Sequence, residues 1–336
     1  PVTSKVIRYG LGAIKGTGKQ AIDAIVAARE EGGAFTSFYD FCVRVDRSRM
    51  NRRTVEALIK GGAFDKVHLN RAELLASVER AFEFAAATQA NANQGGLFDM
   101  LDSHAASHQE PPLVETPVFG VKARLVLEKT AIGFYLSGHL FDEVAQEVRQ
   151  FAKRSIEDIN ESRDPQLLAG IVGDLRVING NRGKLIIFKL DDKTDTLECS
   201  VDEAIFNTNR NLLKDDELII VQGTLQPASE RFGRRFKVTQ VWDLETARCR
   251  FGKYLKVAVN GSAPDIARLT REFPPRAEAS EQGEISRGLA VRLNLRRPGA
   301  VADLQLGDAA RFFPSDAALA SWTAQAHKGL VKIVYE

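Results

Sequence analysis

Cysteine and histidine are scarce in this chain of 336 residues. The three cysteines, at positions 42, 199 and 249, form no Cys-x-x-Cys pair, and the five histidines do not combine with them at any metal-ligand spacing. An odd number of widely separated cysteines favours reduced thiols over a disulfide framework. The scarcity therefore argues against a secreted disulfide-rich domain and against a zinc module, and it predicts a cytoplasmic location.

Long apolar runs and an excess of one charge are also missing. No apolar stretch approaches the ~18 residues of a membrane-spanning helix, so we expect no membrane partner. The formal net charge is only +2, so a nucleic-acid surface would require an uneven distribution of charge. Residues 1–60 do hold eleven Lys or Arg against six Asp or Glu, whereas residues 191–217 are mainly acidic. The length predicts two or three domains, and because the chain begins with Pro1 we expect it to be part of a longer protein.

A glycine-rich turn near the start of the chain predicts contact with a phosphate. Gly16 and Gly18 bracket one residue directly before a helical pattern, which matches a helix-hairpin-helix motif. The amides of such a hairpin and the following helix N-terminus face a nucleic-acid phosphate. A nucleotide-binding phosphate loop does not fit, because Ala13 and Gln20 occupy positions that require Gly and Ser or Thr. A plain turn between packed helices is the alternative. The candidate duplex-binding residues are Lys15, Gly16, Thr17, Gly18 and Lys19.

An arginine cluster lies about one helix pair further along the chain. Between helices predicted at 37–45 and 51–60, four arginines fall within seven residues: Arg47, Arg49, Arg52 and Arg53. A charge cluster is usually a solvated face, but a second hairpin here would flank the same DNA backbone. We therefore add Arg49, Arg52 and Arg53 to the candidate duplex-binding residues.

A short apolar peptide follows the next helix. The small polar residues at 89–93 predict a loop, which ends in Gln-Gly-Gly-Leu-Phe at 94–98. A peptide of this kind fits a partner's groove in extended form, with Leu97 and Phe98 as apolar anchors and Gln94 as the polar end. The alternative is that the two apolar side chains fold back onto the chain's own core.

Prolines at 111, 112 and 117 then predict an extended linker, and a helix ends in the run Gly-Phe-Tyr-Leu-Ser-Gly-His at 133–139. His139 is interpreted as structural, because no Ser or Cys nucleophile with an orienting acid lies near it in the sequence.

Residues 167–246 are the clearest β region. Strands are predicted at 167–178, 184–190, 197–201, 218–225 and 234–242, with a helical run at 202–213. Three strands, a helix and two strands are the order of an OB-fold, a small barrel that often binds single strands. The candidate single-strand contacts are Arg182, Lys184, Phe188, Arg231, Phe232, Arg234 and Arg235. Because the segment is acidic in total, we expect weak binding confined to that edge.

Residues 250–336 predict a compact α+β module. Strands are expected at 254–259, 289–295, 302–306, 309–313 and 330–335, with helices after Ser262 and Ser315 and a loop between the first helix and the second strand. The module has no glycine signature, metal set or acid pair. We therefore interpret it as an interaction domain.

Taken together, the chain resembles the C-terminal half of the bacterial replicative DNA polymerase III alpha subunit family. The resemblance rests on segments 9–16, 56–65, 133–139 and 169–172, and it covers nearly the whole chain. The run at 133–139 is highly specific. The family normally continues with proline where this chain has Leu140.

The resemblance implies that the hairpins bind duplex DNA and that Gln94, Leu97 and Phe98 belong to the internal ligand for the β sliding clamp. It implies an OB domain near the single-stranded template and a C-terminal domain that binds the tau subunit of the clamp loader. It also implies that the palm aspartates and their Mg²⁺ lie upstream, and that the proofreading subunit binds elsewhere. We therefore expect no catalytic residue, metal or cofactor in this part of a DNA-directed DNA polymerase, a nucleotidyltransferase.

The resulting prediction is a multidomain α+β protein. Residues 1–93 form the helix-hairpin-helix region, 94–101 the clamp-binding loop, 102–166 a linker and helical connector, 167–246 the OB-fold, and 250–336 the C-terminal domain. Two alternatives remain: the C-terminal region of an error-prone C-family polymerase, and a stand-alone single-strand-binding adapter. The clamp peptide and the full C-terminal domain favour the replicative form.

Overall fold

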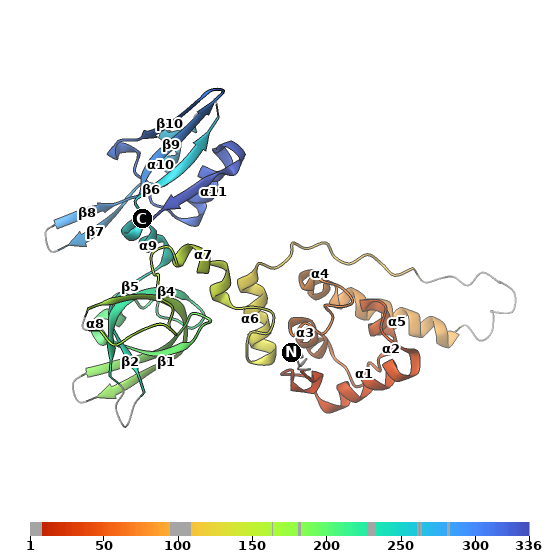
Figure 1. The fold of residues 1–336 in the computed structure, drawn as a ribbon. Helices are drawn as coiled ribbons and strands as arrows, with labels where there is room; N and C mark the ends of the chain where they lie inside the picture. The colour runs from red at the N-terminus through yellow and green to blue at the C-terminus, as the bar shows by residue number, and fades with distance from the viewer. Residues whose placement is uncertain are drawn as a thin grey trace, which may run out of the picture. The chain divides into compact units, whose positions relative to one another are not determined.

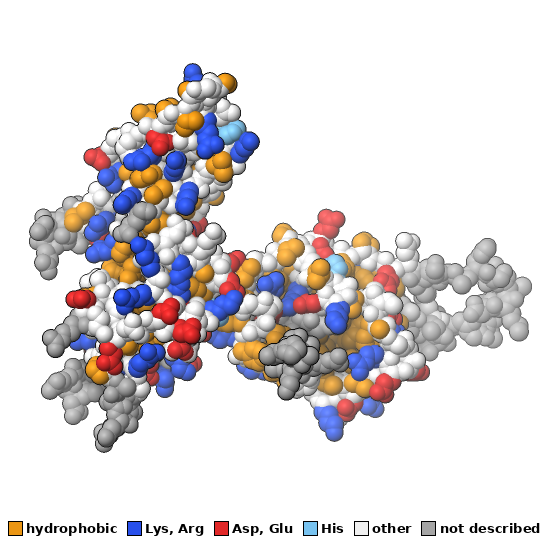
Figure 2. Space-filling view, viewed as in Figure 1, with side chains coloured by type: hydrophobic (Ala, Val, Ile, Leu, Met, Phe, Trp, Pro, Cys, Tyr) orange, Lys and Arg blue, Asp and Glu red, His pale blue; other side chains and the backbone are white. Residues whose placement is uncertain are grey.

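The computed structural model describes residues 9–94, 109–162, 164–180, 183–227, 233–260, 262, 264–280 and 283–335. The chain divides into a helical unit, Pro1–His139, and a β-rich unit, Leu140–Glu336 (Figure 1). Basic and acidic side chains are interspersed on the visible face of both units (Figure 2). Among the described helices, none has the length and apolar character needed to cross a membrane.

The helical unit is built from short helices with side-chain caps. Ser37 and Asn51 accept the N–H of the residue three positions later, and Asn70 accepts the N–H of Ala72, which confirms the helix starts predicted at 37 and 51. The described helices are η1 (Leu11–Ala13), α1 (Lys19–Gly32), α2 (Phe38–Arg44), α3 (Arg52–Lys60), α4 (Arg71–Ala76), α5 (Val78–Gln94) and α6 (Val121–Ile132).

The loop predicted at 89–93 is wrong, because α5 continues through Gln94. The run 85–94 is rich in alanine and glutamine, which have high helix propensity, and these residues outweigh the asparagines among them. On the preceding turn, the side-chain amide of Gln89 donates to the carbonyl of Val43 at 3.3 Å, so the last turns of α5 are tied to α2.

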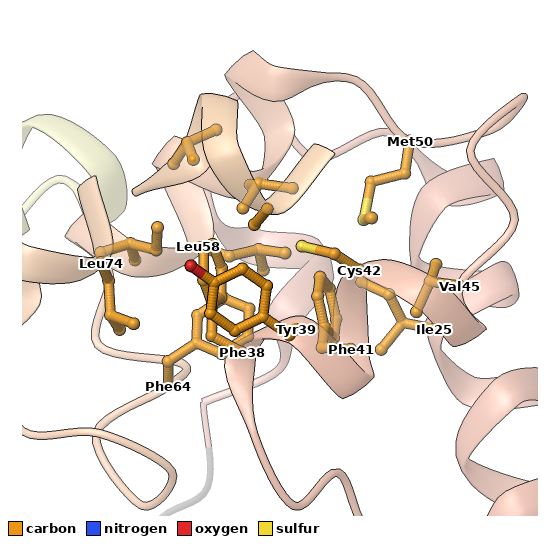
Figure 3. Packing of buried hydrophobic residues seen from close by; sticks show 14 of the residues in the cluster. Ile25, Phe38, Tyr39, Phe41, Cys42, Val45, Met50, Leu58, Phe64 and Leu74 are labelled. Atoms are coloured by element: carbon orange, nitrogen blue, oxygen red, sulfur yellow. The ribbon is translucent and has the colours of Figure 1, made fainter. Parts of the chain in front are cut away.

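Aromatic side chains fill the core between α2 and the helices around it (Figure 3). The ring of Phe64 meets those of Phe38 and Phe41 edge-on, with centroids 5.4 and 4.8 Å apart. Such edge-to-face pairs are favourable beyond their buried area. Cys42 lies in the same core, and burial raises the pKa of its thiol to about 12.

A buried ion network ties α6 to this core. Arg71, at the start of α4, donates to Asp65 at 2.6 and 2.7 Å and to Glu128 of α6 at 2.8 Å. The second oxygen of Glu128 accepts the N–H groups of Leu136 and Ser137, each at 2.9 Å. Glu128 has no exposed surface and Arg71 is 6% exposed. The network therefore fixes the turn that follows α6.

The segment predicted as a linker around the three prolines has no regular secondary structure over 109–120. It nevertheless lies along the helices: the N–H of Val114 donates to the hydroxyl of Ser77, and the amide of Asn70 donates to the carbonyl of Thr116, both at 2.8 Å. This part of the predicted linker is thus bound to the helical unit.

The predicted five-stranded barrel is confirmed. Its strands close in the order β1-β2-β3-β5-β4, with only β3 and β5 parallel, which is the OB-fold topology (Figure 1). The elements are β1 (Gln166–Gly180), β2 (Gly183–Asp191), β3 (Thr196–Asp202), α8 (Glu203–Thr208), β4 (Leu218–Gln226) and β5 (Arg235–Trp242). Asp202 caps α8, which is shorter than the helical run predicted at 202–213.

The C-terminal module is a four-stranded sheet in the order β10-β9-β6-β11, with a separate hairpin of β7 and β8. That hairpin was predicted as a loop, and the strand predicted at 309–313 is the turn η3 followed by one bridge from Phe312 to Leu289. The elements are α9 (Leu244–Phe251), β6 (Tyr254–Val259), α10 (Ile266–Glu272), β7 (Arg276–Ser280), β8 (Gly283–Arg287), β9 (Ala290–Arg297), β10 (Ala300–Gln305), η3 (Asp308–Ala310), α11 (Asp316–Gln325), η4 (His327–Gly329) and β11 (Val331–Val334).

A second cluster, around the buried Arg248, joins α7 (Ala145–Val148), which follows η2 (Leu140–Glu143), to this module. Arg248 of α9 donates to both oxygens of Glu147, at 2.7 and 2.9 Å, and to Asp316 at 2.6 Å. The phenol of Tyr335 donates to Glu147 at 2.6 Å. Burial raises the pKa of that phenol, and the bond to the carboxylate raises it further.

Replacing Glu128 by Ala should destabilise the helical unit by about 3 to 5 kcal/mol, because it leaves the Arg71 guanidinium buried without one of its partners. Glu79→Ala is the matched control: it removes an exposed ion pair with Arg52 and should cost less than about 1 kcal/mol. Calorimetric unfolding of the chain measures both. Both tryptophans lie in the β-rich unit, so their fluorescence transition should not move. Equal stability of the two variants would contradict the prediction.

The stability of the helical unit should also depend on the charge of Glu128. Burial raises the pKa of this carboxyl, but the N–H groups of Ser137 and Leu136 and the Arg71 guanidinium outweigh it, so the pKa lies below its usual 4.5. The contribution is therefore complete above that value and is lost as the pH falls through the lowered pKa. Thermal unfolding of the wild type and Glu128→Gln should differ at neutral pH and converge in acid. A constant difference at all pH values would contradict this.

Candidate nucleic-acid interface

The glycine hairpin is closed by Thr17. Its hydroxyl oxygen lies 2.9 Å from the carbonyl oxygen of Leu11 and 2.7 Å from that of Ile14, and its N–H donates to Ile14 at 3.2 Å. Gly16 has a φ of +90°, the region that favours glycine. The polar groups of Thr17 are thus engaged within the hairpin, where they set its shape, and its contact with DNA stays a prediction.

Backbone donors gather where the hairpin enters α1. Gly18 is the N-cap residue of α1 and provides no side-chain cap. In the described chain, no acceptor is found for the N–H groups of Gly18, Lys19 and Gln20, as expected for the first turn of a helix. The side chains of Lys15 and Lys19 are exposed on either side. Amides at a helix N-terminus are suited to bind an anion such as a phosphate.

The structure brings the arginine cluster to this hairpin. The hydroxyl of Thr54, in the first turn of α3, lies 3.4 Å from the carbonyl oxygen of Gly16. Arg52 and Arg53 directly precede Thr54, so they begin α3 at the same end of the unit. Arg52 pairs with Glu79 at 2.7 Å and Arg49 with Asp46 at 3.4 Å, both in exposed pairs. Such pairs contribute about 0 to 1 kcal/mol and exchange readily for another anion.

The segment after α6 is a further part of this site that the sequence patterns did not place there. The N–H of Lys15 donates to the carbonyl of Ala131 at 2.7 Å, and the ring of Tyr9 meets Phe134 edge-on at 5.4 Å. Phe134 and Leu136 are 44% and 53% exposed. The only sequence signal for this part of the site was that the run at 133–139 is highly specific to the family that the chain resembles. No pattern in the run indicated that it lies against the glycine hairpin.

The barrel site is supported only in part. Phe188 has no exposed surface and packs in the barrel core with Ile186 and Leu190, so its predicted contact with a base is corrected. Lys184 lies 3.3 Å from Glu203, and the Nε of Arg235 lies 2.7 Å from Glu198.

The guanidinium of Arg234, another candidate contact, lies 3.9 Å from the carboxylate of Asp195. Arg182, Arg231 and Phe232 lie outside the described residues. Exposed apolar side chains at the β1–β2 hairpin were missed by the sequence patterns: Val177, Ile178 and Leu185.

The predicted clamp peptide is not described, except that Gln94 is the last residue of α5. Leu97 and Phe98 lie outside the described residues. In the part of the chain that the structure describes, no group of three or more His, Cys, Asp or Glu side chains is placed to hold a metal ion.

The chain matches a family model described as a helix-hairpin-helix motif over residues 2–74. It is 42% identical over 275 residues to the DNA polymerase III subunit alpha of Neisseria meningitidis serogroup B, covering 81% of this chain and 23% of that protein. With the subunit of Pseudomonas aeruginosa the identity is 34%, covering 92% and 28%. The chain belongs to the DNA polymerase III alpha family. It spans about a quarter of the length of the curated relatives it matches.

Solved structures similar to this chain include single-stranded DNA-binding proteins. One is a small protein from Streptomyces coelicolor, 16% identical, with a TM-score of 0.22, covering 26% of this chain and 95% of that one. Another is the mitochondrial protein Rim1 from S. cerevisiae, 7% identical, with a TM-score of 0.21, covering 24% and 95%.

Proposed function

We propose that this chain is the DNA-handling and partner-binding part of a replicative DNA polymerase of the DNA polymerase III alpha family. The observation that carries the proposal is the cluster of amides at Gly18, Lys19 and Gln20, which have no acceptor among the described residues and lie beside the arginines of α3. The similarity to DNA polymerase III alpha subunits supports the same conclusion. In this proposal residues 1–93 hold the DNA duplex, and residues 167–246 hold the single strand.

The proposed duplex contact is made through the backbone of both molecules. A phosphate oxygen accepts the free amides at the start of α1, and Lys15, Lys19 and the α3 arginines contact the phosphates beside it. Contacts of this kind carry no sequence information. A copying enzyme must grip every sequence equally and move along it, so backbone contacts suit the task.

The proposed single-strand contact lies on the barrel edge and is weak. Lys184 and Arg235 are each paired with a carboxylate, which a nucleic-acid phosphate would have to displace. The exposed apolar side chains Val177, Ile178 and Leu185 provide surface against which bases can pack. Charge alone would therefore contribute little to this contact.

The proposed protein partners are the sliding clamp and the clamp-loader tau subunit. Residues 94–101 hold the clamp peptide, with Gln94, Leu97 and Phe98 as its contacts, and the peptide begins at Gln94, the last residue of α5. Residues 102–166 connect the regions, and residues 250–336 bind the tau subunit. Catalysis, with its Mg²⁺, belongs to a palm domain outside this chain, and the whole protein acts in the cytoplasm.

Replacing Arg49, Arg52 and Arg53 by Ala should weaken duplex DNA binding and flatten its salt dependence. Each lost phosphate contact removes about 0.9 from the slope of log affinity against log salt. Fluorescence anisotropy with a labelled duplex at several salt concentrations measures the slope. The control removes the same charge from exposed Arg29, Lys66 and Lys328 and should leave the slope unchanged. Equal slopes for the two triple variants would refute the duplex site.

Replacing Gln94, Leu97 and Phe98 by Ala should abolish binding to the sliding clamp and leave the fold intact. Loss of two apolar anchors costs roughly 2 to 4 kcal/mol each, more than a hundredfold in affinity together. Surface plasmon resonance on immobilised clamp measures this. A control with Asp102, Ser103 and His104 replaced by Ala should bind like the wild type. Clamp binding that survives the first triple change would exclude the peptide.

A further inference from the structure

The C-terminal sheet has two chemically different faces. On one face, the buried residues Leu255, Val257, Val291, Leu293 and Ile333 pack with residues of α10 and α11. The residues between them in each strand lie on the opposite face, because side chains alternate along a strand. That face carries four basic side chains among small or apolar ones such as Ala258, Val301 and Val334, and the Lys256 side chain is 41% exposed there.

Three cations lie side by side across this opposite face. Lys332 of β11 pairs in register with Lys256 of β6, which pairs with Arg292 of β9. Neighbouring strands are about 4.8 Å apart, and like charges directly opposite one another destabilise a sheet. Among the described positions of this face Asp303 is the only carboxylate, 3.7 Å from Lys256. The row therefore places like charges side by side, and a polyanion would relieve their repulsion.

Arg292 is held flat on this face. Its guanidinium carbon lies 3.8 Å from the centroid of the Tyr254 ring, and its Nε donates to the side-chain oxygen of Gln305 at 3.1 Å. Arg296, two residues along β9, donates to Asn294 at 2.9 Å, and Asn294 donates to Asp303 at 2.6 Å. Asn294, the middle residue of this chain of bonds, is only 5% exposed, whereas Arg296 and Asp303 are exposed. The two arginines are thus positioned before any ligand arrives.

We propose that this cationic sheet face, made of Tyr254, Lys256, Arg292, Arg296 and Lys332, binds single-stranded nucleic acid. The lysines contact phosphates, and a base stacks on the guanidinium plane that Tyr254 supports. In a DNA duplex the base faces are stacked on one another and cannot stack on the guanidinium. An acidic protein would pair with the cations but would have no base to stack on the Arg292 guanidinium. On the visible face of the C-terminal module, Figure 2 shows Lys and Arg side chains outnumbering the acidic ones among them.

This site goes beyond the proposed function, which assigns the single strand to the barrel and this module to a protein partner. Anisotropy of a labelled oligothymidylate with the whole chain tests it. The variant Arg292→Ala with Lys332→Ala should bind about tenfold more weakly, because it loses the stacking plane and one phosphate contact. Its salt slope should be lower by about 0.7, the contribution of the one phosphate contact made by Lys332. The control Arg268→Ala with Arg271→Ala removes the same charge from α10, on the other side of the sheet, and should bind like the wild type.

Three outcomes would overturn the proposal or separate it from the proposed function. If the wild type binds the oligonucleotide and the two double variants bind it equally well, the cationic sheet face is not a binding site, while the proposed function stands. If the wild type binds neither duplex nor single strand, both fail. If the double variant at Arg292 and Lys332 keeps its binding to the oligonucleotide but no longer binds an immobilised tau subunit, the cationic sheet face binds a protein and the proposal is wrong.

The single variant Lys332→Glu guards against a folding defect, because Lys332 is exposed on β11. It should weaken oligonucleotide binding more than Arg268→Glu does. Trp322 is fully buried in the core of the same module, so its fluorescence reports whether each variant is folded. Equal binding by the two folded single variants would overturn the proposal.

Discussion

The helical unit depends on one buried carboxylate. Glu128 of α6 accepts the Arg71 guanidinium and the N–H groups of Leu136 and Ser137, so it joins three separate stretches of chain. Removing two charges from water costs about as much as their attraction returns, so such a pair adds little net stability. Its effect is geometric: it sets the end of α6, whose Ala131 carbonyl accepts the N–H of Lys15. The glycine hairpin is therefore held in place by an interaction some distance from it in the sequence.

The β-rich unit uses the same device where α7, α9 and the C-terminal module meet. Arg248 is held by Glu147 and Asp316, and a second pair joins Arg149 to Asp192, which also accepts the N–H of Ile156 at 2.8 Å. In both units a buried arginine is shared among carboxylates from different elements. An unpaired buried charge is far costlier than a paired one, so alternative packings that separate these partners are disfavoured.

The order of strands in the barrel could be predicted because each strand shows its own alternation and each turn its own residues. The error at Phe188 arose from choosing it for its chemistry, although its spacing from Ile186 and Leu190 already put it on the inward face. Glu128 could not be identified in this way, because it looks like any other charged residue of a helix until Arg71 lies against it. Likewise, no local pattern shows that Thr54 meets Gly16. These contacts depend on tertiary packing, which a single sequence does not display.

If the chain has the proposed function, its near-neutral net charge limits how tightly it binds DNA. Arg49, Arg52, Lys184 and Arg235 each face an acidic side chain, so a DNA phosphate must replace a partner that is already present. The pairs of Arg49, Arg52 and Lys184 are exposed and exchange at a cost of about 0 to 1 kcal/mol, which lowers affinity without preventing binding, whereas the Arg235 side chain is only 15% exposed. The free amides at Gly18, Lys19 and Gln20 face no such competitor in the described chain. The backbone amides would then position the DNA, and the charged side chains would add only modest affinity. This combination lets a protein hold DNA and still move along it.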